Sequence, residues 1–198
     1  MVLKKSAPLL FLTALSVLAL ASGCVTTAPI VKLPEKTPIA VAFVLDNDHE
    51  GLVGEVPEAL KREVSQVLAE RNLDLFEIPF SSYAPVFAPV RDSQRRLARL
   101  SNSEATLTML VETKAVYFAQ LNGRYRWTVN FKLNVARKDA ASDPFGVVAD
   151  LSTIVDFEHQ KEPEVIASIA SDLARRVGAL LDEFLAASDL SLAEKKNP

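Results

Sequence analysis

Residues 122–135, which read NGRYRWTVNFKLNV, decide the fold. The Asn122-Gly123 pair is the strongest short-range signal for a tight turn between two β-strands. From Tyr125 to Val135, apolar and aromatic residues alternate with polar ones, which is the period of a strand with one buried and one exposed face. The stretch therefore predicts a β-hairpin whose second strand is long and buried on one side only.

The flanking sequence extends this hairpin into a meander of three strands. Residues 106–118 alternate loosely between apolar and polar side chains, and residues 146–157 do so again after a turn-forming segment, KDAASDP, at residues 138–144. Strands joined by such short connections are expected to be antiparallel neighbours. Because one face of this meander is polar, helices should pack on the other face.

The remaining periodic segments predict an α/β fold of the α+β kind. Residues 39–45 (IAVAFVL) and residues 73–78 are short and apolar, as in strands, whereas residues 54–71 and 163–187 carry apolar side chains at helical spacing. Asn72 is the expected end of the first helix. We expect a two-layer sandwich, with a mixed sheet and two main helices packed on one face, over residues 39–188. Residues 189–198 are expected to form a flexible tail.

Residues 80–89 (FSSYAPVFAP) combine aromatic side chains with two prolines, which disfavours regular structure. If this segment is exposed, Phe80, Tyr83 and Phe87 form an apolar patch that needs a partner. The alternative, that these aromatic side chains fold back onto the core, is the commoner outcome.

A row of arginines follows this segment. Residues 92–101 predict a short helix with Asp92 as its N-cap, on which Arg95 and Arg99 share a face and Arg91 extends the row. Arg126 adds a cation on the polar face of the long strand. These side chains are candidate contacts for an envelope protein, an anionic glycolipid or peptidoglycan carboxylates. The alternative is an ordinary solvated helix face.

The sequence predicts no metal site, no cofactor and no catalytic residue. Residues 46–51 (DNDHEG) resemble the start of a calcium loop, but Pro57 stands at the twelfth position, where a bidentate Glu is required. His49 and His159 are the only histidines and lie outside any metal-binding spacing. Asp46 and Asp48 would serve acid–base chemistry only if they lined a pocket, so we do not expect an enzyme.

The net charge and the cysteine content restrict the partners and the covalent cross-links that the protein can have. The full chain has a formal net charge of −3, and removal of residues 1–23 with Lys4 and Lys5 leaves 20 basic against 25 acidic side chains. A net charge of −5 argues against nucleic acid as a partner. The single cysteine excludes an internal disulfide.

The N-terminus carries an export signal. Lys4 and Lys5 precede an apolar run over residues 7–21, and the run ends in Leu20-Ala21-Ser22-Gly23-Cys24. This ending resembles the lipoprotein signal of bacteria, although Ala21 stands where Leu is usual. The resemblance implies cleavage between Gly23 and Cys24, attachment of diacylglycerol to the Cys24 sulfur and acylation, with palmitate as the expected fatty acid, of the new amino group.

The mature chain would then begin with a lipidated tether over residues 24–38. Val25, in place of the Asp that favours the inner membrane, implies the outer membrane, with the domain facing the periplasm. An ordinary secretory signal, leaving a free thiol at Cys24, is the alternative.

The order of elements resembles that of a group of envelope lipoproteins. The short strand at residues 39–45, the helix at residues 55–71, the strand pair at residues 106–136 and the long helix at residues 167–185 follow in the same order. The group includes the lipopolysaccharide-assembly, curli-transport and penicillin-binding-protein activator lipoproteins and the Tol-system amino-terminal domain. The resemblance implies a non-enzymatic assembly or scaffold component of an envelope complex. Asp46-Asn47-Asp48 replaces the Asn-Arg-Thr-like turn that is common in the lipopolysaccharide-assembly lipoprotein.

A small-ligand or lipid carrier, with the ligand held between helices and sheet, remains the alternative function. Dense packing around Trp127 and Phe131 would argue against it, and a deep apolar cavity would argue for it.

Overall fold

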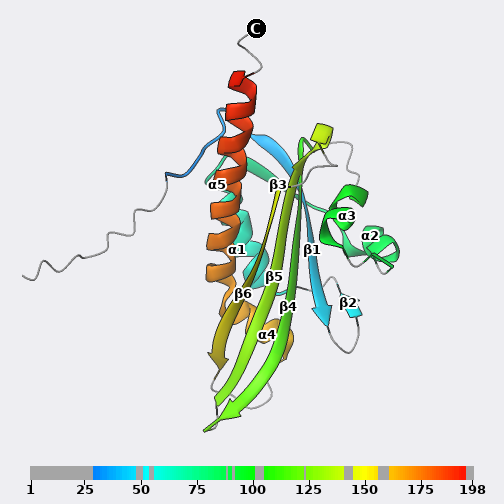
Figure 1. The fold of residues 1–198 in the computed structure, drawn as a ribbon, viewed down its shortest axis with the longest axis vertical. Helices are drawn as coiled ribbons and strands as arrows, with labels where there is room; N and C mark the ends of the chain where they lie inside the picture. The colour runs from blue at the N-terminus through cyan, green and yellow to red at the C-terminus, as the bar shows by residue number, and fades with distance from the viewer. Residues whose placement is uncertain are drawn as a thin grey trace, which may run out of the picture.

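A mixed six-stranded sheet forms the centre of the fold (Figure 1). This computed structural model describes residues 29–47, 51–53, 56–87, 89–90, 92–100, 105–122, 124–140, 145–155 and 161–194. The strands are β1 (Thr37–Asn47), β2 (Gly51–Val53), β3 (Leu73–Glu77), β4 (Leu107–Leu121), β5 (Arg124–Arg137) and β6 (Phe145–Val155). They lie in the order β2-β1-β4-β5-β6, and β3 also pairs with β1.

The predicted antiparallel meander is confirmed as β4, β5 and β6. Val111 lies opposite Leu133, and Leu133 lies opposite Val147, so the predicted inward residues of the three strands share a face. Asn122 adopts a positive φ of 50°, as expected at the turn of the hairpin. The inward residues in the middle of β5 are fully buried: Val129, Phe131, Leu133 and Val135.

Strand β1 is buried on both faces. It runs parallel to both β4 and β3, and every residue from Ile39 to Leu45 has at most 1% of its surface exposed. Its alternate side chains enter two separate hydrophobic clusters, one on each side of the sheet. This placement explains why its sequence is continuously apolar rather than alternating.

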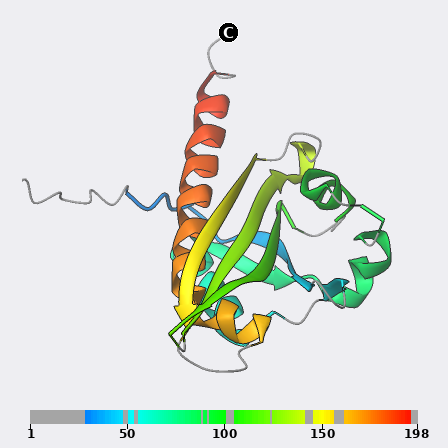
Figure 2. The same ribbon diagram turned by 60° about the horizontal axis from the view of Figure 1, so that its bottom comes forward.

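The larger cluster lies under the two main helices, α1 (Glu58–Ala69) and α5 (Ala170–Glu194), as predicted (Figure 2). Leu60, Val64 and Leu68 of α1 are fully buried, and Asn72 follows the helix with a positive φ of 60°. One prediction over the last helix is wrong: the chain breaks at Ile169, which separates α4 (Glu162–Ser168) from α5. Helix α5 also continues to Glu194, through part of the predicted tail.

Two short helices cover part of the opposite face of the sheet: α2 (Phe80–Phe87) and α3 (Ser93–Arg99). The prediction of irregular structure over residues 80–89 is therefore wrong. Phe80, Tyr83 and Phe87 recur at helical spacing and pack together, and this packing outweighs the hydrogen bond lost at Pro85. The α3 prediction is confirmed, including Asp92 as the N-cap.

Candidate functional site

The predicted lipidation site lies outside the described residues, as do Gly23 and Arg91. None of the described helices combines the length and apolar character that crossing a bilayer requires. The described chain begins at Pro29, and Val31, seven positions after Cys24, is the first residue with a hydrogen bond to the domain.

Residues 31–37, here called the strap, lie against the domain although they were predicted to be part of the free tether. The Val31 N–H donates to Asp182 Oδ1 at 3.0 Å, and the Leu33 N–H donates to the Arg71 carbonyl at 3.2 Å. Asn72 binds the strap twice, through its side-chain amide to the Leu33 carbonyl at 2.6 Å and through its own carbonyl to the Thr37 N–H at 2.9 Å. These contacts lead the chain directly into β1.

An ion pair between Arg71 and Asp182 fixes the strap to both main helices. The guanidinium donates to both carboxylate oxygens, from Nε to Oδ1 at 3.0 Å and from Nη2 to Oδ2 at 2.7 Å, and Nη1 donates to the Val67 carbonyl at 2.8 Å. Gly178 makes room for it, since a Cβ there would lie 2.8 Å from Nη2. This two-point geometry is the strong form of an arginine–carboxylate contact.

A groove of about 900 Å³ lies beside this pair, between α1 and α5. Small and apolar side chains form much of its lining, with acidic side chains among them. The lining includes Val31, Val67, Ala174, Gly178, Glu63 and Glu183. The predicted ligand position, between helices and sheet near Phe131, is instead filled by the core, in which Phe131 is 1% exposed.

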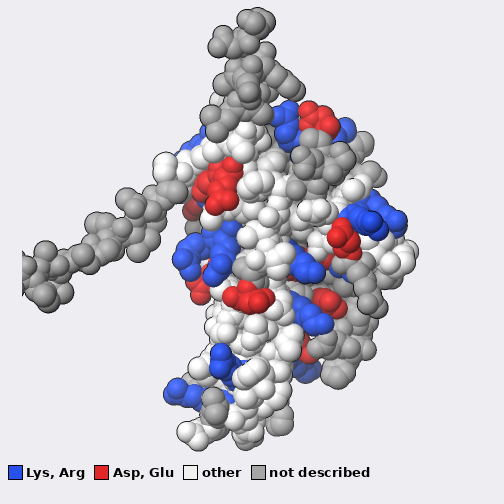
Figure 3. All heavy atoms as spheres, viewed as in Figure 1, with Lys and Arg blue, Asp and Glu red and all other residues white. Residues whose placement is uncertain are grey.

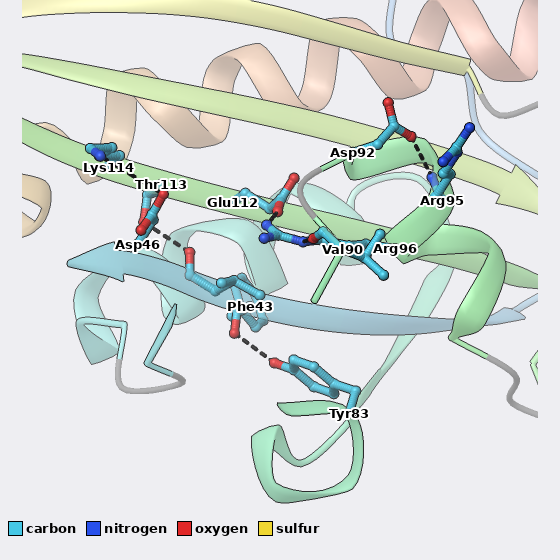
Figure 4. Close-up of polar contacts among 11 residues, drawn as sticks. Phe43, Asp46, Tyr83, Val90, Asp92, Arg95, Arg96, Glu112, Thr113 and Lys114 are labelled. Atoms are coloured by element: carbon cyan, nitrogen blue, oxygen red, sulfur yellow. Dashed lines mark hydrogen bonds and ion pairs between the residues drawn. The ribbon is translucent and has the colours of Figure 1, made fainter. Parts of the chain in front are cut away.

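The structure places two of the predicted partner-binding aromatics in the core rather than on the surface. Tyr83 donates its hydroxyl to the Phe43 carbonyl at 2.7 Å (Figure 4). Phe87 has no exposed surface. Burial raises the pKa of Tyr83 well above its usual 10.0, and the charge of Glu77 raises it further. Phe80 is half-buried, with its ring edge-on to Tyr83. The surface available to a partner therefore excludes Tyr83 and Phe87.

A buried ion pair that the sequence reasoning missed holds α3 to the sheet. Arg96 donates from Nη1 to Glu112 Oε1 and from Nε to the Val90 carbonyl (Figure 4). Its guanidinium lies 5.8 Å from the centre of the Phe87 ring. Glu112 Oε2 is buried without a hydrogen-bond partner. The sequence did contain a signal for this pair. Glu112 is the one acidic residue of β4 and stands at an outward position, and four arginines lie in or beside α3.

Arg95 and Arg99 are exposed on α3, as predicted. The Arg95 N–H donates to Asp92 Oδ1 at 2.8 Å, which starts the helix, and Arg99 Nη1 lies 3.4 Å from the Val86 carbonyl. Both side chains can reach a partner without a change in the fold.

Arg126 belongs to a different surface, at the far end of the β4–β5 hairpin. A register shift between Tyr117 and Ala119 places Phe118 outward, where it is 67% exposed with the Arg126 guanidinium 5.0 Å from its ring centre. Tyr117 is 47% exposed and contacts the rings of Tyr125 and Trp127. Phe118 and Arg126 lie on the outer face of the hairpin end, whereas Tyr117 and Tyr125 lie with Trp127 on the other face. We call Tyr117, Phe118, Tyr125 and Arg126, which cover both faces of this end, the distal hairpin surface.

The predicted cationic residues thus do not form one patch. Leu97 and Leu100, from α3 and its end, pack in one cluster with Ala136, ten residues along β5 from Arg126. Ten strand residues span about 33 Å. Figure 3 shows basic side chains distributed over several parts of one face of the molecule.

Among the described residues, no group of three or more His, Cys, Asp or Glu side chains is placed to hold a metal ion. Asp48, His49 and His159 lie outside those residues. Asp46 is the penultimate residue of β1, and its carboxylate lies 3.9 Å from Lys114 Nζ.

No family model matches the sequence, and no curated protein matches it. Among solved structures, the protein CT253 of Chlamydia trachomatis has a TM-score of 0.47 at 12% identity, over 77% of this chain and 99% of that one. Rare lipoprotein B of Shewanella oneidensis has a TM-score of 0.38 at 11% identity, over 79% and 99%. A lipoprotein of Neisseria meningitidis has a TM-score of 0.39 at 9% identity, over 72% and 99%. Overlaps at this level assign the chain to no family.

Proposed function

We propose that this chain is a lipid-anchored, non-enzymatic adaptor of the bacterial outer membrane that faces the periplasm and joins an envelope protein complex. The distal hairpin surface is the observation that carries the proposal. It exposes aromatic side chains and an arginine at the end of a rigid hairpin, and Tyr and Arg in particular are enriched at the energetic centres of protein interfaces.

The chemistry of this surface favours a protein partner. Phe118 and Tyr117 offer apolar area that water solvates poorly, while Arg126 supplies a charge held over the Phe118 ring. An acidic or carboxylate-bearing partner surface would satisfy the guanidinium while it covers the Phe118 ring on the same face.

The strap supports the anchored arrangement. Val31, which donates a hydrogen bond to Asp182, lies seven positions after Cys24, and an extended chain of that length spans at most about 25 Å. An acylated Cys24 would therefore hold the domain close to the membrane.

The proposal is tested by crosslinking in intact envelopes followed by affinity capture. Phe118→Ala with Arg126→Glu should reduce crosslinked partner at least tenfold, whereas Arg62→Glu, an exposed reversal on α1, should leave it unchanged. Equal capture of the partner by the wild type, the double variant and Arg62→Glu would show that the distal hairpin surface does not bind the partner.

The exposed arginines of α3 form a second arm of the same experiment. If Arg95→Glu with Arg99→Glu loses capture of the partner and Phe118→Ala with Arg126→Glu does not, the partner binds α3 instead. Both helix positions are exposed, so neither reversal should unfold the domain.

A carrier function is the second candidate, and the groove between α1 and α5 is the observation that favours it. If the groove holds a small apolar molecule, native mass spectrometry of the purified protein should show that molecule bound, and Ala179→Trp at the groove lining should remove it. A wild-type spectrum with the mass of the polypeptide and its anchor alone would argue against a carrier.

A further inference from the structure

Among the described strands, none pairs with the outer edge of β6. This strand is the last in the order β2-β1-β4-β5-β6, and it pairs with β5 without a register shift from Tyr125 opposite Val155 to Val135 opposite Phe145. Within the described part of the chain, this edge of eleven residues presents backbone N–H and C=O groups that no neighbouring strand pairs.

The features that usually protect such an edge are missing from β6. The strand contains no Lys, no Arg and no Pro, and its one charged residue, Asp150, accepts a hydrogen bond from the Asn130 side chain of its own sheet. Helix α5 packs on the inner face, where Phe145 contacts Phe184. The outer face of β6 remains open, because Val148 is 67% exposed and Ile154 is 58% exposed.

The sequence of β6 is complementary to itself about Leu151. Val148 and Ile154 stand three positions before and after Leu151, on the same face. An antiparallel pairing of two copies centred on Leu151 therefore places each Val148 opposite the second copy's Ile154. The same register sets Val147 opposite Val155, and Asp150 opposite Ser152, whose hydroxyl can donate to the carboxylate.

We propose that β6 is a dimerisation edge, which pairs antiparallel with β6 of a second copy of this chain about a two-fold axis at Leu151. The pairing joins the two sheets into one and covers the exposed Val148 and Ile154 side chains. A register centred on Asp150 is excluded because it would set two carboxylates opposite each other. A single strand edge makes a small interface, so we expect a concentration-dependent dimer.

This proposal is independent of the anchor and of the distal hairpin surface. Sedimentation velocity of the purified mature chain, in reducing buffer and over a hundredfold range of concentration, should show a monomer–dimer equilibrium. Val148→Lys with Ile154→Lys should abolish the dimer, because the register sets two ammonium groups opposite each other. Val148→Lys with Ile154→Glu should retain it, because the same register sets opposite charges face to face.

Ser152→Lys is the matched control on the same strand. It lies on the same exposed face, but the register sets it opposite Asp150, so the dimer should persist. Circular dichroism establishes that each variant is folded. A wild-type chain that stays monomeric throughout, a dimer that survives the double lysine variant, or capture of a different protein's strand at this edge would overturn the proposal.

Discussion

Asp182 joins three segments that lie far apart in the sequence. Its carboxylate accepts two hydrogen bonds from Arg71 at the end of α1 and one from the Val31 N–H of the strap. The Arg71 side chain is almost fully buried. One side chain thus fixes both the packing of α1 on α5 and the path of the chain into β1.

Asp182→Ala should lower the free energy of unfolding by about 3–5 kcal/mol, because it removes the two-point partner of a buried guanidinium and leaves only the more exposed Glu70 carboxylate, 3.8 Å from Arg71 Nη1, as a counter-charge. Urea unfolding measures the change. Arg175→Ala is the control on the same helix, since its 2.7 Å pair with Asp172 is exposed and should contribute at most about 1 kcal/mol. Losses of equal size would mean that the Arg71–Asp182 pair is not what holds the strap and helices together.

Gly178→Ala should have two opposing effects on the free energy of unfolding. Alanine in a helix interior normally adds about 1 kcal/mol of stability over glycine, but here the new Cβ would lie 2.8 Å from Arg71 Nη2, which the ion pair holds in place. We expect a net loss of about 1–3 kcal/mol. The loss should shrink in the Asp182→Ala background, where Arg71 is free to move; the same loss in both backgrounds would contradict this explanation.

Tyr83→Phe should show a stability difference that depends on pH. At pH 7 the variant loses the hydrogen bond to Phe43 and about 1 kcal/mol of stability. Because burial raises the pKa of Tyr83 in the folded state, the unfolded chain ionises first above pH 10 and the contribution of Tyr83 to stability falls there. Unfolding followed from pH 7 to pH 11 should therefore show the difference narrowing, and a constant difference would contradict the burial argument.

At the scale of elements, the periodicity of apolar residues was sufficient to predict the inward side chains wherever one face of an element is buried. The alternation over β5 and the helical spacing in α1 and α5 predicted their inward residues correctly, since burial on one side leaves a regular pattern in the sequence. The Asn122-Gly123 turn and the Asp92 N-cap were also predictable, because each depends on a few adjacent residues.

Features that depend on contacts between distant residues were missed. Helix α2 forms despite Pro85 because Tyr83 and Phe87 pack on the sheet, and no local signal reports that packing. The strap was assigned to the tether because its binding depends on Asp182, 151 positions away from Val31. The Arg96–Glu112 pair likewise joins a helix to a strand sixteen positions away, and no local signal predicted that Arg96 would be buried.

The attachment of α3 to the sheet can be tested through this pair. Arg96→Leu should lower stability by about 3–5 kcal/mol, because Glu112 is left buried and unpaired. Arg96→Leu with Glu112→Leu should recover most of that loss, since neither charge then needs a partner. Chemical unfolding of the wild type and the two variants measures the recovered stability. A double variant that is no more stable than Arg96→Leu alone would show that the two side chains do not stabilise each other.

At the scale of the whole molecule, the strap and the distal hairpin surface lie at different parts of the sheet. The strap enters β1 at Thr37, and β4 extends over fifteen residues to the hairpin turn, a length of about 50 Å (Figure 1). A domain held near the membrane by its strap can therefore present the hairpin to a partner well away from its point of attachment.

The anchor at Cys24 is the claim on which the proposed function depends. Mass spectrometry of the protein extracted from washed membranes tests it directly. The account predicts an N-terminal peptide that begins at Cys24 and carries diacylglyceryl and acyl groups, in a protein that resists release by salt and alkaline washing. A Cys24 without lipid, in a protein that those washes release, would contradict it.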